Sequence, residues 1–210
     1  MAEELGRIKK PEAEQFEGKR KLCLVPLIFS ADNAPTEYAE KFARYWEEVS
    51  QHIANMESKT SPVRHVYHES ITLANDEGMK LLEKLSPASH QIAQDKCQSG
   101  ATLEATEAKE LADEAMDWER FLLMGCFSQK VANTVSGFYL ESLKKRYEHI
   151  AQVIDETLKP GEVGMLIIRE GHMVQFPRDM EVFSVSPPAL DDVHRWIRDQ
   201  QANEKPGEAE

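Results

Sequence analysis

The sequence predicts an α/β fold: a small parallel or mixed sheet with helical covering layers and a long helical hairpin inserted between the second and third strands. Two segments, centred on Val25 and Ile167, are apolar almost throughout, which is typical of strands buried on both faces. An amphipathic helix pattern follows the first segment, and a long stretch of helical pattern, about 75–158, precedes the second. We therefore expect the two apolar segments to lie side by side and parallel in one sheet.

The N-terminal part reads as strand, helix, strand. Within the first strand, KLCLVPLIF (21–29), Pro26 predicts a bulge or a nearby sheet edge because proline cannot donate a ladder hydrogen bond. A helix follows as far as about Ser58, predicted by apolar residues spaced three and four apart: Phe42, Trp46, Val49, Ile53 and Met56. The β-branched and aromatic segment SPVRHVYHESI (61–71) is the second strand, which makes a β–α–β unit with a parallel pair of strands.

The next part of the chain is predicted to be helical throughout. Short helices are expected at 75–85 and 86–100, then a third over 101–125 and the longest from 128 to about 158. About 30 helical residues would span roughly 45 Å, more than a small sheet needs for cover. The long helix therefore pairs with its predecessor as a projecting hairpin or reaches a second subunit. Its stripe comprises Val131, Val135, Phe138, Leu143, Arg146, Ile150 and Ile154.

The C-terminal part returns to the sheet. EVGMLIIRE (162–170) is predicted as a central strand, and HMVQFP (172–177) and MEVFSV (180–185) as two further short strands. SPPALDDVHRWIRDQ (186–200) predicts a closing helix, entered through two prolines.

A single domain is expected over residues 21–199, with the helical insertion at about 75–158. Residues 1–20 are charged and show no clean period, so we expect a flexible lead, and residues 200–210 are expected to form a disordered tail. No run of about 18 apolar residues predicts a membrane span. Three cysteines without paired or zinc-type spacing favour a cytoplasmic protein.

The formal net charge of −12 argues against nucleic acid or an anionic membrane as partner, because phosphate contacts need clustered cations. One basic cluster, Lys144 to Arg146, could still form a positive face for a nucleic-acid-associated role. That interpretation fails if Glu141 and Glu148 interrupt the face.

The most specific site hypothesis is topological. In open parallel sheets, ligands bind beyond the carboxyl ends of the strands. Strand alternation places His65 and His68 on opposite faces, so they cannot chelate one metal. Side chains expected at the strand ends could perform general acid–base catalysis or hold one divalent ion. These candidate catalytic residues are Asp32, His68, Glu69, Glu170 and His172.

No motif in the sequence identifies a reaction or a cofactor. The sequence contains neither GxGxxG nor GxxxxGK[ST], so it has no nucleotide-binding fingerprint, and it lacks the GxSxG of α/β-hydrolases. The leading expectation is a cytoplasmic binding or regulatory protein that acts through the helical hairpin, as a homo-oligomer or with a protein partner. The alternative is a hydrolase or acid–base enzyme, with or without a divalent metal, at the strand ends.

Overall fold

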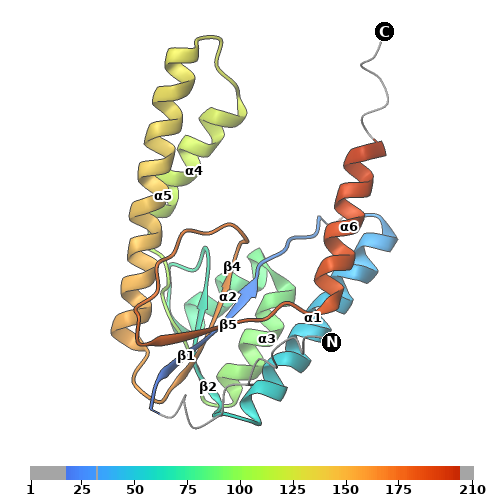
Figure 1. Ribbon diagram of the computed structural model, residues 1–210, viewed down its shortest axis with the longest axis vertical. Helices are drawn as coiled ribbons and strands as arrows, with labels where there is room; N and C mark the ends of the chain where they lie inside the picture. Colours follow the sequence, from blue (N-terminus) through green and yellow to red (C-terminus); the bar gives the residue numbers. More distant parts are fainter. Residues whose placement is uncertain (1–17, 32, 204–210) are drawn as a thin grey trace, which may run out of the picture.

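The computed structural model describes residues 18–31 and 33–203 (Figure 1). Five strands form one sheet in the order β3-β2-β4-β1-β5, and every neighbouring pair is parallel. Helices cover both faces, which confirms the predicted α/β class. The strands are β1 (Arg20–Pro26), β2 (Val63–His68), β3 (Thr102–Leu103), β4 (Val163–Ile168) and β5 (Met180–Ser184).

The two apolar segments are neighbours at the centre of the sheet, as predicted. Val25 of β1 lies opposite Ile167 of β4, and all six residues of β4 are buried. The expectation of a bulge or sheet edge at Pro26 was wrong, because β1 lies between β4 and β5. Pro26 ends the strand, where its missing N–H removes no hydrogen bond from the strand interior.

Helices divide between the two faces of the sheet. One face is covered by α1 (Thr36–Glu57), α2 (Asn75–Leu85), α3 (Pro87–Gln98) and α6 (Pro188–Asn203). The other is covered by α5 (Gln129–Thr157), against which α4 (Lys109–Leu123) packs (Figure 1). Alternate residues of β4 feed the two cores: Val163, Met165 and Ile167 on the first side, and Leu166 and Ile168 on the second. This division follows from the period of two along a strand.

The predicted helix over 101–125 is wrong at its start. Residues Thr102 and Leu103 form β3, which pairs with His65 and Val66 of β2, and α4 begins only at Lys109. Leu103 is buried against the edge of the sheet, so tertiary packing overrides the helical propensity of the segment. The pair α4 and α5 consequently lies between the third and fourth strands of the chain.

The predicted strand over 172–177 is also absent. This segment belongs to the connection that leads from β4 past β1 to β5. Val174 and Phe176 pack into the core beneath α5, so their alternate spacing reflects burial rather than pairing.

The boundaries at the two termini differ from those expected. Arg20 already belongs to β1, and α6 continues to Asn203, so residues 200–203 are helical rather than part of a tail. The remainder of the predicted lead and tail, 1–17 and 204–210, lies outside the described residues. None of the helices within the described ranges is long and apolar enough to cross a membrane.

Candidate functional site

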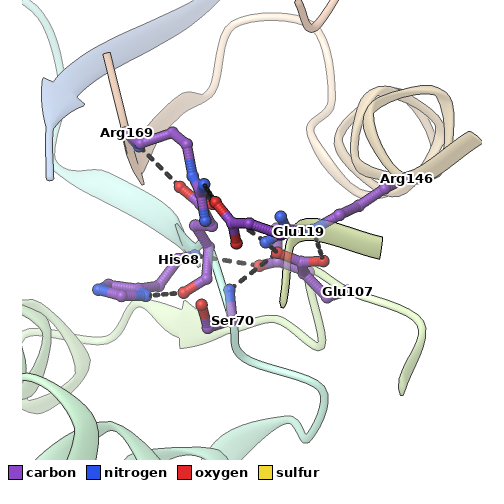
Figure 2. Close-up of polar contacts among 8 residues, drawn as sticks. His68, Ser70, Glu107, Glu119, Arg146 and Arg169 are labelled. Carbon is purple, nitrogen blue, oxygen red and sulfur yellow. Dashed lines mark hydrogen bonds and ion pairs between the residues drawn. The ribbon is translucent and has the colours of Figure 1, made fainter. Parts of the chain in front are cut away.

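Four charged residues form a network at the carboxyl edge of the sheet (Figure 2). Because β2 and β4 are parallel neighbours, Glu69 and Arg169, the residues that follow them, meet at this edge. The Arg169 backbone N–H donates to Glu69 Oε2 at 2.7 Å, and its side-chain Nε donates to Glu69 Oε1. From α5, Arg146 donates through Nε to Glu107 Oε2 at 2.6 Å and through Nη2 to Glu69 Oε1 at 3.0 Å.

The network is almost fully withdrawn from water on its acidic side. Glu69 is 1% exposed, Glu107 3% and Arg146 6%. Burial alone would lower the pKa of the Arg146 guanidinium, but its hydrogen bond to Glu107 and the attraction of both carboxylates keep that pKa above its ordinary value. The backbone N–H of Ser70 completes the arrangement by donating to Glu107 Oε1 at 2.9 Å. Each buried carboxylate therefore has a charged partner, without which its burial would be strongly unfavourable.

A cavity of about 460 Å³ lies over this network, between α2, α4 and α5. That volume falls within the range of small-molecule sites. Apolar side chains form part of its wall: Leu81, Leu85, Ala112, Ala115, Met116 and Leu143. Charged groups line it as well, and Ser70, Thr72 and Tyr139 add hydroxyl groups; the charged residues are Arg146, Arg169, Lys109, Asp113 and Glu119. The cavity thus combines an apolar wall with a few polar groups at the end of the sheet.

His68, a predicted site residue, points away from the network. It is 1% exposed, and its Nε2 lies 3.0 Å from Ser89 Oγ on α3 while its Nδ1 contacts the Glu69 carbonyl oxygen. Burial lowers the pKa of His68 to about 4, so the imidazole is neutral near pH 7. Ser89 is fully buried as well, and neither residue lines the 460 Å³ cavity. This serine–histidine contact is therefore buried apart from the cavity.

The other predicted site residues are spread along the same edge. Glu170 is exposed and pairs with His194 of α6 at 2.7 Å. His172 packs edge-on against Tyr147 and Phe176, and burial lowers its pKa. Asp32 lies outside the described residues. Among the four described candidates, the structure brings Glu69 alone into the buried network.

The described ranges contain no cluster of side chains suited to binding a metal ion. No group of three or more His, Cys, Asp or Glu residues there could hold an ion. The separation of His65 from His68 is as predicted: His65 Nδ1 lies 2.8 Å from Glu104 Oε1, on the opposite face from Ser89.

Sequence reasoning missed Arg146 as a partner of Glu69 and Glu107 as the second carboxylate on Arg146, and it placed Arg169 at the strand end without pairing it with Glu69. One signal was present, since Arg146 occupies a position on the apolar stripe of α5, where a charged side chain needs a buried counter-ion. The neighbouring lysines, Lys144 and Lys145, make the same residue also look like part of a basic surface cluster.

The basic cluster at 144–146 does not form a continuous positive face. Lys144 lies 3.8 Å from Glu148, Lys145 lies 2.9 Å from Glu141, and Arg146 is buried. The nucleic-acid interpretation of these three residues was therefore wrong.

A second candidate site is the end of the helical pair, residues 116–140, which we call the hairpin end. Of the thirteen large apolar side chains exposed in the described chain, eight lie here. Ala115 is the one buried residue of α4, and between Gln129 and Glu141 α5 buries none. The two helices meet partly through Trp118 and Phe138, whose ring centroids are 5.0 Å apart. The eight are Met116, Phe121, Leu123, Met124, Phe127, Val131, Phe138 and Leu140.

Comparison of the chain with protein family models, curated proteins and solved structures found no significant match.

Proposed function

We propose that this protein acts by binding through its hairpin end, as an interaction module rather than an enzyme. The observation that carries the proposal is the concentration of exposed apolar side chains over residues 116–140, where only two helices are present and no third layer covers them. Apolar surface gathered in this way is a frequent feature of protein–protein interfaces. The three free cysteines agree with a cytoplasmic location for this activity.

The occupant that we propose is a second copy of this chain. Along α4, residues 109–123 carry five acidic and two basic side chains, whereas Lys130 is the single charged residue of α5 between 129 and 140. A two-fold arrangement would set α4 of one protomer against α5 of the other, which keeps the two acidic α4 helices apart around a shared apolar centre. The product is a four-helix bundle, in which each pair of helices supplies the layer that the other lacks.

The test is the molar mass in solution of the wild type and of a triple variant, Leu123→Ser, Met124→Ser and Phe127→Ser. Light scattering should give twice the chain mass of 23.9 kDa for the wild type and a single chain mass for the variant. The matched control carries three apolar-to-serine changes at exposed positions elsewhere: Phe29, Leu73 and Val182.

The control should remain a dimer, because its substitutions lie outside the hairpin end. A wild type that stays monomeric at concentrations of about 100 μM, well above the Kd of ordinary specific interfaces, would overturn self-association. So would a triple variant that dimerises as strongly as the wild type.

A further inference from the structure

We propose that the cavity over the buried network binds an amphipathic carboxylate, that is, a small molecule with one carboxylate on an apolar body. This site adjoins the hairpin end, with which it shares Met116, but the proposal does not depend on self-association. The first support is its location, beyond the carboxyl ends of two adjacent parallel strands, β2 and β4, where the chain leaves toward opposite faces of the sheet. Open α/β sheets bind their ligands at such positions.

The second support is an unused donor group on a buried cation. Arg146 donates through Nε to Glu107 and through Nη2 to both Glu69 and Glu107. Its Nη1 donates no hydrogen bond to any described residue. Because Arg146 lines the cavity, this group is available to a ligand. Its guanidinium is already fixed in position by the two carboxylates, so a ligand would lose little side-chain entropy in using it.

The third support is the long contact made by the Nη1 group of Arg169, whose Nε is already bonded to Glu69. Glu119 Oε1 lies 4.0 Å from Arg169 Nη1, which is an ion pair but too long for a hydrogen bond (Figure 2). An incoming carboxylate can displace Glu119 and make the shorter, charge-assisted bonds that Arg169 and Arg146 offer from two sides. Glu119 is partly exposed and can turn to water when it is displaced.

The apolar wall specifies the rest of the ligand. Leu81, Leu85 and Met116 on facing helices can enclose a short hydrocarbon chain or ring, which supplies affinity through burial of apolar surface. Ser70 and Thr72 at the strand end can direct further polar atoms. A ligand that was polar throughout would leave this wall without a partner.

The test is calorimetric titration with octanoate, with 1-octanol and octyl phosphate as comparison probes. Octanoate should bind the wild type, and octanol, which lacks the charge, should bind at least about tenfold more weakly. Absence of octanoate binding, or octyl phosphate binding more tightly than octanoate, would overturn the proposal.

Two variants leave the buried network untouched and keep the test decisive. Glu119→Gln should tighten octanoate binding by about two- to fivefold, because it removes a competing exposed ion pair. Its control, Asp117→Asn, removes the same charge from the same helix outside the cavity and should change nothing.

The second variant fills the cavity with a larger side chain. Ala112→Phe should abolish octanoate binding, whereas Ala132→Phe, at a half-buried position of α5 that does not line the cavity, should preserve it. Equal binding by the two phenylalanine variants would place octanoate elsewhere and refute the site.

Discussion

The helix α5 contains two regions that differ in burial. Toward its C-terminal half, from Ser142 onward, it packs against the sheet, and Arg146 joins it to Glu69 and Glu107. Toward its N-terminal half, it contacts α4 and leaves Val131, Phe138 and Leu140 exposed. The difference shows that one continuous helix can be fixed firmly at one end by buried charge while apolar side chains at its other end remain exposed.

The largest expected effect on the free energy of unfolding is at the end of α5 that packs against the sheet. Arg146→Met should lower the free energy of unfolding by about 3–5 kcal/mol, because two buried carboxylates lose a cation. Denaturant unfolding would measure this. The control, Lys144→Met, removes an exposed lysine two positions away and should cost less than about 0.5 kcal/mol. Similar losses in the two variants would contradict a special role for the network.

The next effect is a dependence of stability on pH that originates beside the network. The pKa of His68 is about 4 in the folded protein and 6.5 as the ordinary value, so the unfolded chain takes up the proton first as pH falls. The stabilisation is complete above pH 6.5 and is lost as pH falls from 6.5 to 4. From pH 7 to 5 the free energy of unfolding should decrease by about 2 kcal/mol from this residue.

Substitution of His68 by Gln should remove most of this pH dependence, while His172→Gln should retain most of it because His172 is only half-buried. Urea titrations at a series of pH values would provide the measurement. A wild type with equal stability at pH 5 and pH 7 would show that folding does not lower the pKa of His68.

The smallest effect is expected at the hairpin end. In a sample dilute enough to be monomeric, Phe127→Ser should change the free energy of unfolding by less than about 0.5 kcal/mol, because the ring is exposed. At high concentration the wild type should gain stability relative to this variant, since association stabilises the folded state by mass action. A loss above 1 kcal/mol in the dilute sample would mean that Phe127 packs on its own chain.

The sequence was most informative where burial is uniform along an element. The continuous apolar segments around Val25 and Ile167 predicted their parallel pairing, because central strands of a parallel sheet are buried on both faces. The period of α1 predicted a helix that the structure places at Thr36–Glu57. Local composition failed where distant contacts decide, as at β3, whose two residues are ordered by pairing with β2.

The sequence could predict where the candidate site lies, but not which residues form it. Strand order and direction bring Glu69 and Arg169 to one edge, which the topological rule anticipates. Glu107 and Arg146 reach that edge from a loop and from a helix, and no local spacing connects either of them to Glu69. The orientation of His68 away from the cavity follows from strand alternation, which places it on the opposite face from Glu69.

The length of α5 beyond the sheet would convert a small tilt about a pivot at Arg146 into a larger displacement of the hairpin end. Fifteen residues separate Arg146 from Val131, a length of about 22 Å at 1.5 Å per residue. A tilt of about 10° at the pivot would therefore displace the far end by about 4 Å, which is enough to change the fit of one bundle against another. In the dimer that we propose, a carboxylate bound beside Arg146 would in this way change the alignment of the two helical pairs.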